Sequence, residues 1–202
     1  MAGGPGGRLL EEQVTTVRQL GLGGVVEIRP ARHGDHRGFF SEVWSASALA
    51  EAGIDTVFVQ DNHSFSAQAA VLRGLHYQEP PFAQAKLVRV TRGSIFDVAV
   101  DIRQGSPTFG KWVGLTISEA EWNQIYVPEG FAHGFVTLEP NTEVLYKVSA
   151  LYAPQHDRAI RFDDPAIGID WPLNGREPIL SDKDRNAPLL SEVAPPFQHD
   201  GM

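Results

Sequence analysis

The chain has 202 residues and a mass of 22.1 kDa, which is long enough to bury a full hydrophobic core and short enough for one domain. A formal net charge of -8 and a pI near 5.3 argue against nucleic acid as a partner. The absence of cysteine excludes disulfides, cysteine-ligated metals and thiol catalysis, and it makes the cytoplasm the expected compartment.

The two ends of the chain predict neither export nor membrane insertion. Glu11 and Glu12 lie where a signal peptide would need its apolar core, and no stretch approaches the length that spans a bilayer. We expect a mobile N-terminal tail over residues 1–12, one domain over residues 13–191, and a C-terminal tail over residues 192–202.

Short segments rich in Val, Ile, Phe and Thr alternate with turns marked by Gly and Pro. One internal helix is expected in SASALAEAG, which runs from Ser45 to Gly53. This pattern predicts an all-β sandwich or jelly roll with few helices. The predicted strands cover residues 25–29, 38–43, 57–62, 72–77, 86–91, 94–102, 110–116, 124–127, 134–138, 143–148 and 159–162.

The segment SIFDVAVDI, residues 94–102, alternates with a period of two. One face of the strand carries Phe96, Val98, Val100 and Ile102. The other face carries Ile95, Asp97, Ala99 and Asp101. Two acids on one face predict that this face borders a polar cavity or solvent.

The segment VLRGLHYQ, residues 71–78, places His76 in the middle of a strand. In a regular strand Arg73 and His76 point to opposite faces, whereas a bulge at Gly74 would turn Arg73 to the side of His76. The spacing alone is equally compatible with a packed, hydrogen-bonded histidine of the core.

A second histidine, His133, lies in PEGFAHGF, residues 128–135, which looks like the second half of the cupin metal motif. The first half should supply an HxH pair and a carboxylate, yet the corresponding segment offers only His76. Two histidines without a third ligand make a poor transition-metal site, so no catalytic metal is expected.

Eight segments of the chain form a recognisable series. They are DHRGFFSEVW, VQDNHSFS, VLRGLHYQ, AQAKLVRVTRGSIFDVAVDIR, SPTFGKW, PEGFAHGF, LYK and LSDKDRNAP. Their order and spacing resemble those of the dTDP-4-dehydrorhamnose 3,5-epimerase family. The resemblance covers residues 25–190 and implies a cupin-type jelly roll, or double-stranded β-helix. It further implies epimerisation at C3 and C5 of a dTDP-4-keto-6-deoxy sugar without a cofactor.

By this resemblance, His76 is the base that removes protons beside the C4 ketone, and Asp184 orients it. Tyr146 lies across the sugar ring as proton donor, because inversion needs removal on one face and return on the other. Lys86 stabilises the enolate oxygen, with His133 close by.

The resemblance also implies a set of substrate-binding residues. Arginines match the two phosphates, amides match the sugar and nucleotide, and an aromatic ring stacks on thymine. Asp157 stands where the family pattern leads us to expect glutamate. Arg37 and Glu42 reach into the neighbouring subunit, which predicts a functional homodimer. The full set is Arg37, Glu42, Gln60, Asn62, Arg73, His133, Tyr152, Asp157 and Lys183.

Three alternatives stay open beside the double epimerase. An enzyme that inverts only C3 or C5 would differ by small shifts of ring and donor. A metal-dependent cupin enzyme would lose activity with a chelator, and a silent sugar-nucleotide-binding module would lack the base or the donor. His76, Tyr146 and Asp184 are all present, which favours the enzyme.

Overall fold

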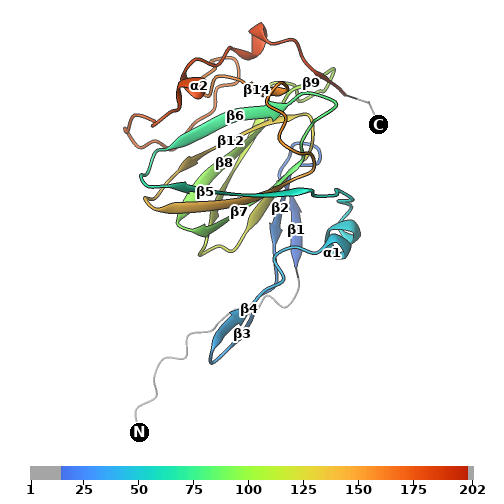
Figure 1. Cartoon of the computed structure of the whole chain (residues 1–202), viewed down its shortest axis with the longest axis vertical. Coiled ribbons are helices and arrows are strands. Elements are labelled where there is room, and N and C mark those ends of the chain that lie inside the picture. The colour runs from blue at the N-terminus through green and yellow to red at the C-terminus, as the bar shows by residue number, and fades with distance from the viewer. Residues whose placement is uncertain (1–14, 200–202) are drawn as a thin grey trace.

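A computed structural model describes residues 15–199 (Figure 1). The expected tail over residues 1–12 lies outside this part of the chain, as do residues 200–202 at the other end. Within residues 15–199, no helix has the length and apolar character needed to cross a bilayer.

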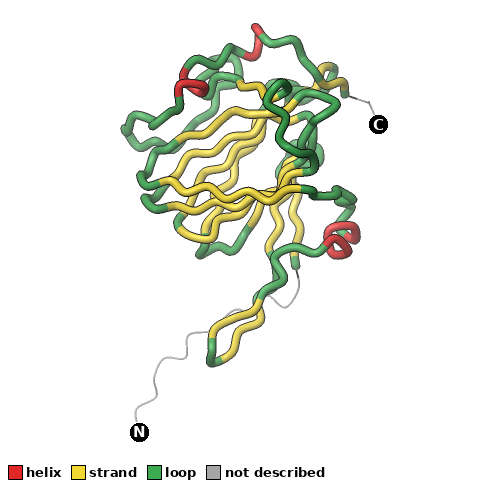
Figure 2. The backbone as a smooth tube through the Cα atoms, in the orientation of Figure 1, coloured by secondary structure: helices red, strands yellow, loops and turns green. Residues whose placement is uncertain are grey.

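Two antiparallel sheets face each other and form a jelly roll (Figures 1 and 2). The six-stranded sheet has the order β1 (Thr16–Gln19), β2 (Val26–Arg29), β11 (Gln124–Val127), β7 (Lys86–Arg92), β13 (Thr142–Val148) and β5 (Gln60–Ser66). The five-stranded sheet has the order β10 (Trp112–Ser118), β8 (Ser94–Asp101), β12 (Phe131–Thr137), β6 (Leu72–Gln78) and β14 (Asp157–Ala159).

Smaller elements complete the described chain. A hairpin of two short strands projects from the body of the protein, and two further strands pair near the C-terminus (Figure 1). These elements are β3 (His33–Asp35), β4 (Gly38–Phe40), β9 (Arg103–Gln104), β15 (Phe197–Gln198), α1 (Ala46–Glu51), α2 (Asp182–Arg185) and the 3-10 helix Leu190–Glu192.

The predicted all-β class is confirmed, and every predicted strand overlaps an observed one. Several predicted bounds were displaced. β5 begins only at Gln60 rather than at Val57, β4 ends at Phe40, and β14 shares only Ala159 with the predicted strand 159–162. Val57 favours strands by its β-branched side chain, but it is largely exposed and has no buried sheet face to pack against, so the strand does not extend to it. The predicted helix forms as α1, but Ser45 at its N-cap makes no side-chain capping bond.

The alternation of residues 94–102 is confirmed by the packing of β8. Ile95 and Ala99 belong to the core between the sheets, while the opposite face packs beneath the C-terminal segment. The expected polar cavity or solvent beside this face was wrong, because Asp97 is fully buried on the inner face without lining the cavity, and Asp101 borders neither cavity nor solvent. It is fully buried and accepts hydrogen bonds from Arg103, among other donors. Burial raises its pKa, yet these bonds outweigh burial and lower the pKa to about 2.

The segment expected as a C-terminal tail contains packed residues. Phe197 and Gln198 form β15, which pairs in parallel with β9. The ring of Phe197 meets the ring of Tyr77 edge-on, with centroids 6.2 Å apart. The boundaries of the single domain stay a prediction, and these contacts place residues 197–198 against the body of the fold.

A bulge at Gly74 breaks the register between β6 and β12. His76 pairs with His133, but the next pair joins Arg73 to Phe135, so β6 contains one extra residue. The φ angle of Gly74 is +133°, and a Cβ atom there would lie 2.5 Å from the Cα of Gly134. Only glycine fits this close approach, and the bulge turns Arg73 to the side of His76.

We predict that Gly74→Ala lowers the free energy of unfolding by about 3 kcal/mol, because it combines a strained φ angle with backbone overlap. Gly105→Ala is the matched control: its φ angle is also positive, at +82°, but a Cβ atom there would meet nothing within 4 Å. Urea denaturation should show a loss of about 1 kcal/mol for the control. Equal losses for both variants would contradict the crowding at Gly74.

Candidate active site

A cavity of about 270 Å³ opens between the two sheets. Its wall combines β5, β7 and β13 of one sheet with β6 and β12 of the other, and α2 closes one side. All four predicted catalytic residues line it, together with two predicted binding residues. The lining residues are Ser64, Arg73, His76, Lys86, His133, Phe135, Tyr146, Ser181 and Asp184.

His76 and Asp184 form a close pair on one wall of the cavity. The Nε2 atom of His76 lies 2.5 Å from Oδ1 of Asp184, and the other carboxylate oxygen accepts a hydrogen bond from Ser181 at 2.7 Å. Burial raises the pKa of Asp184, but the bonds from His76 and Ser181 outweigh it and hold the pKa below its ordinary value. The charged carboxylate therefore accepts a hydrogen bond from the Nε2–H group of His76, and this tautomer leaves Nδ1 with its lone pair free to act as a base.

Ser181 builds the turn that presents Asp184. It is the N-cap of α2, and its hydroxyl oxygen accepts a hydrogen bond from the backbone N–H of Asp184. The same hydroxyl donates to the Asp184 carboxylate. The cap thus fixes both the start of the helix and the carboxylate that it carries.

Tyr146 faces the cavity from the other sheet. It lies on β13, and burial raises the pKa of its phenol, an effect that the charge of Arg73 partly offsets. The phenol is therefore protonated at neutral pH. His76 on β6 and Tyr146 on β13 stand on opposing sheets, so the cavity has a base on one wall and a proton donor on the other.

Two buried polar residues, Lys86 on β7 and His133 on β12, also line the cavity. Lys86 donates to the backbone oxygen of His76 at 3.4 Å, and burial lowers its pKa to about 8 against the opposing charges of Asp97 and Asp157. At neutral pH most Lys86 side chains still carry a charge. The Nε2 atom of His133 lies 2.9 Å from both oxygens of Asp97, and burial lowers the pKa of this imidazole although Asp97 opposes the shift.

Asp97 was not among the predicted site residues. Its signal was present in the alternation of residues 94–102, which placed an acid on the inner face of the strand. The structure shows that its partner is His133, from a strand that pairs directly with β8.

Five other predicted binding residues do not line the cavity but are linked to one another by hydrogen bonds, and two of them, Asp157 and Lys183, lie near enough to Lys86 to influence its pKa. The amide nitrogen of Gln60 donates to Asn62 at 2.7 Å, and the Gln60 oxygen accepts from the backbone N–H of Tyr152 at 3.2 Å. One oxygen of Asp157 accepts both from Lys183 at 2.5 Å and from the Tyr152 hydroxyl at 3.1 Å.

Arg37 and Glu42 are not brought to this cavity within one chain. Arg37 sits at the tip of the β3–β4 hairpin, where its guanidinium pairs with Asp35 at 2.5 Å. Figure 1 shows this hairpin extending away from the two sheets. Glu42 follows the hairpin and does not line the cavity.

The two cavity histidines are poorly suited to holding a metal. Each has its Nε2 atom engaged with a carboxylate, Asp184 for His76 and Asp97 for His133. Across residues 15–199, no three side chains of His, Asp or Glu come together as a ligand set.

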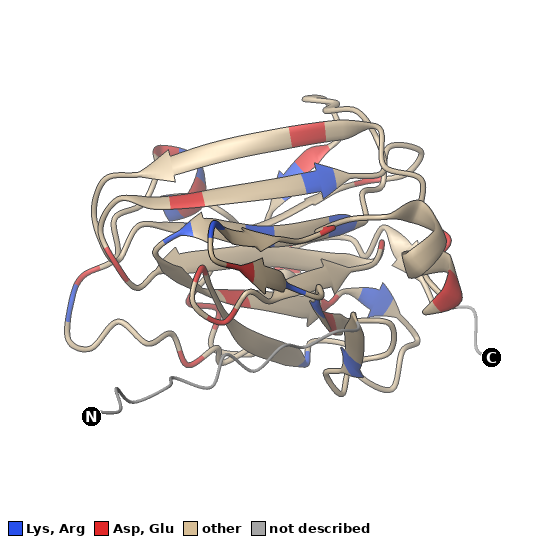
Figure 3. Ribbon diagram, turned by 90° about the horizontal axis from the view of Figure 1, so that it is seen from below, with Lys and Arg blue, Asp and Glu red and all other residues tan. Residues whose placement is uncertain are grey.

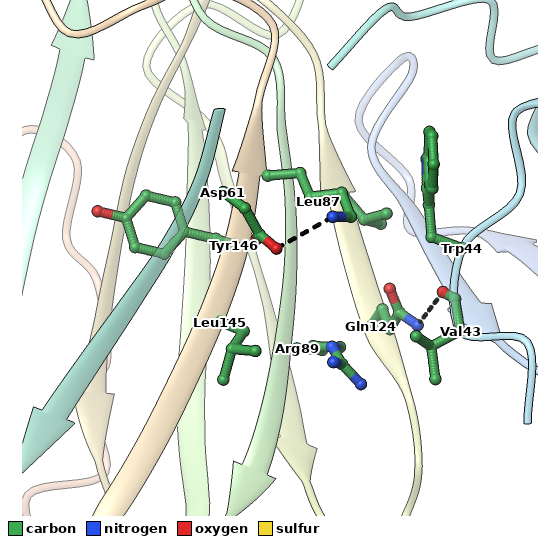
Figure 4. Close-up of a pocket in the computed structure, with 9 residues that line it drawn as sticks. Val43, Trp44, Asp61, Leu87, Arg89, Gln124, Leu145 and Tyr146 are labelled. Atoms are coloured by element: carbon green, nitrogen blue, oxygen red, sulfur yellow. Dashed lines mark hydrogen bonds and ion pairs between the residues drawn. The ribbon is translucent and has the colours of Figure 1, made fainter. Parts of the chain in front are cut away.

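A second, smaller depression lies on the outer face of the six-stranded sheet (Figure 4). Asp61 pairs there with Lys147 at 3.1 Å, and Gln124 donates to the backbone oxygen of Val43. Figure 4 shows the ring of Tyr146 directed away from these side chains. Acidic and basic residues are interspersed over the strands, without a face of one charge (Figure 3). The candidate active site is therefore identified by the residues that line the cavity and not by a charged surface.

Sequence similarity to known proteins identifies the family of this chain. The family model described as dTDP-4-dehydrorhamnose 3,5-epimerase matches residues 19–192. The chain belongs to this family. The proteins named dTDP-4-dehydrorhamnose 3,5-epimerase of Sinorhizobium fredii and Pseudomonas aeruginosa are each 50% identical to it, over 96% and 87% of this chain and 98% and 96% of theirs.

A solved structure of this family confirms the cupin-type jelly roll. The dTDP-6-deoxy-D-glucose-3,5-epimerase of Legionella pneumophila, in complex with dTDP-4-keto-L-rhamnose, superposes with a TM-score of 0.88 at 43% identity. The match covers 93% of this chain and 100% of that one. A protein similar to this chain in fold and sequence therefore binds a dTDP-linked keto sugar.

Proposed function

We propose that the protein epimerises C3 and C5 of dTDP-4-keto-6-deoxyglucose to give dTDP-4-keto-rhamnose. One observation carries the proposal: the Asp184-bound imidazole of His76 and the phenol of Tyr146 enter one cavity from opposing sheets. An imidazole facing a phenol is the arrangement that proton removal on one side and return on the other requires. The names of the relatives support this substrate.

In the proposed reaction His76 takes the proton from the carbon beside the C4 ketone, and the electron pair moves onto the ketone oxygen. The charge of the resulting imidazolium is stabilised by Asp184. Lys86, on the six-stranded sheet, donates to the enolate oxygen, with His133 close by on the five-stranded sheet. Losing a donor of this kind typically costs about 3 to 4 kcal/mol. Tyr146 then protonates the carbon from the opposite face.

Once His76 has released its proton to solvent and Tyr146 has taken one up from solvent, the same events repeat at the second carbon. Both C3 and C5 neighbour the C4 ketone, so one enolate-stabilising group serves both positions. The alternative is an enzyme that inverts only C3 or only C5. The double epimerase is preferred because relatives at 50% identity are named 3,5-epimerases.

We propose further that the working unit is a homodimer. Phe39 is 50% exposed and Phe40 is 70% exposed on a hairpin that extends from the body, and a two-stranded hairpin has little stability alone. A second copy covering this hairpin would bring Arg37 and Glu42 toward a partner cavity.

The absence of cysteine supports a cytoplasmic location, which cell fractionation tests.

Tyr146→Phe should slow completed inversion at least about a hundredfold while first-proton exchange with solvent falls much less, because only the returning proton is lost. The measurement is proton NMR of dTDP-4-keto-6-deoxyglucose in deuterated water with chelator-treated protein. The wild-type protein should exchange both C3 and C5 hydrogens and form product. A wild-type protein that is inactive until a metal is added would overturn the proposal, as would equal loss of exchange and inversion in the variant.

The homodimer is tested by sedimentation equilibrium of the full chain. We expect twice the mass of one chain, about 44 kDa, given the 22.1 kDa protomer. Phe40→Asp should shift the population toward monomer and reduce activity, because a charge enters the covered face. A fully active monomer would contradict the shared site.

A further inference from the structure

The helix that carries Asp184 is too short to hold its own position. α2 has four residues, and one turn of helix returns too few hydrogen bonds to offset the cost of forming it. The hydrogen bond between Asp184 and His76 therefore depends on the contacts that fix the surrounding chain to the rest of the fold. Residues 179–190, which contain α2, are called the α2 segment below.

The N-terminal end of the α2 segment is fixed to the start of β6 by its backbone. The N–H group of Ile179 donates to the oxygen of Ala70 at 2.8 Å, and the oxygen of Ile179 accepts from the N–H group of Leu72 at 3.0 Å. Ile179 thereby forms a parallel bridge with Val71. Because β6 also carries His76, this end of the segment is tied to the strand of the base.

The C-terminal end of the α2 segment is fixed by a buried side chain, that of Asp164. One carboxylate oxygen accepts a hydrogen bond from the backbone N–H of Leu190 at 2.7 Å, and the other accepts from the backbone N–H of Ala166 at 2.8 Å. Asp164 is only 2% exposed, and a carboxylate at this depth needs such donors. The bond to Ala166 closes a local turn, whereas the bond to Leu190 joins two parts of the chain 26 positions apart.

The loop that carries Asp164 is itself attached to β6. Ile160 exchanges two backbone hydrogen bonds with Leu75, at 2.9 and 3.1 Å. The backbone N–H of Arg161 donates to the oxygen of Pro188 at 2.8 Å, which supports the same end of the α2 segment. Both ends of the segment are therefore attached to β6, one directly and the other through the loop of Asp164.

We propose that Asp164 is a positioning residue of the reaction: by binding the backbone N–H of Leu190, it holds Asp184 in place against His76. This inference rests on the proposed function, in which His76 is the base. Asp164 does not line the cavity, so its effect on proton removal passes through the α2 segment. A catalytic group displaced by about 1 Å through a distant change can lose about a hundredfold in rate.

Asp164→Asn tests this role with little change in size. The single remaining oxygen can accept from Ala166 or from Leu190 but not from both, and the local turn to Ala166 orders less chain, so the bond to Leu190 should be the one lost. Entry of deuterium from solvent into C3 and C5 of dTDP-4-keto-6-deoxyglucose should slow about tenfold to a hundredfold. Asp163→Asn is the matched control: this neighbouring aspartate is exposed, accepts from Arg161, and should keep the wild-type rate.

Two measurements separate positioning from a general loss of stability. In the background of Asp184→Asn, Asp164→Asn should slow the residual exchange less than about twofold, because the carboxylate that it positions is already gone. Nitrogen-15 NMR should show the wild-type imidazole of His76 protonated at Nε2, and a mixture of both tautomers in Asp164→Asn. The signals of His76 are assigned by their absence from His76→Ala.

A second pair of variants removes the donor instead of the acceptor. Leu190→Pro lacks the backbone N–H, and proline suits this position because Leu190 begins the 3-10 helix and Leu189 before it is extended, with ψ 157°. Leu190→Ala keeps the N–H and loses the same apolar packing. Exchange should therefore be about tenfold or more slower in Leu190→Pro than in Leu190→Ala. This comparison decides the question if Asp164→Asn does not fold.

Several results would overturn the inference. A wild-type exchange rate in folded Asp164→Asn, or equal rates in the two variants of Leu190, would show that the anchor does not serve the reaction. Additive losses with Asp184→Asn, or an unchanged tautomer of His76 beside a reduced rate, would make the role of Asp164 merely structural. A wild-type protein that exchanges neither hydrogen would refute the proposed function itself, whereas failure of the inference leaves wild-type exchange intact.

Discussion

The geometry of the cavity depends on the close approach of two glycines. Gly74 on β6 and Gly134 on β12 pack where any Cβ atom would overlap backbone. This contact allows one extra residue in β6, so Arg73 and His76, three positions apart, both face the cavity. In a regular strand they would lie on opposite faces of the sheet.

The same bulge keeps the apolar side of β6 in register with the core. Leu72, Leu75 and Tyr77 remain buried beneath the five-stranded sheet, on either side of the extra residue. The fold thus gains a second polar side chain in the cavity without exposing an apolar one. Its cost is a backbone conformation that glycine tolerates and other residues rarely adopt.

Burial then adjusts the chemistry of the residues that the strands bring together. The pKa of Lys86 falls to about 8 while that of Tyr146 rises, so near neutral pH the first is mostly charged and the second is neutral. Asp184 stays charged because His76 and Ser181 donate to it. A chain with a formal charge of -8 therefore presents cationic donors, Arg73 and Lys86, where an anionic ligand would bind.

The sequence predicted the strands and the division of β8 into two faces, because the side chains of a strand alternate with a period of two. It could not show that Asp184 meets His76, since 108 positions separate them and a loop carboxylate has no periodicity. That pair came from family resemblance alone, as did Lys86. The one-turn helix α2 was missed because four residues are too few for a helical pattern. The pattern grouped Asp97 with Ile95 and Ala99 on one face, but it could not show that Asp97 is buried against His133, because that contact depends on the order of the strands in the sheet.

The central claim is that the imidazole of His76 removes the hydrogen beside the ketone. The most direct measurement is the rate at which deuterium from solvent enters C3 and C5 of dTDP-4-keto-6-deoxyglucose, comparing wild-type protein with a folded His76→Ala variant. The account predicts that the variant loses exchange at both carbons by at least about a hundredfold while still binding dTDP. Near-normal exchange in the folded variant would contradict it.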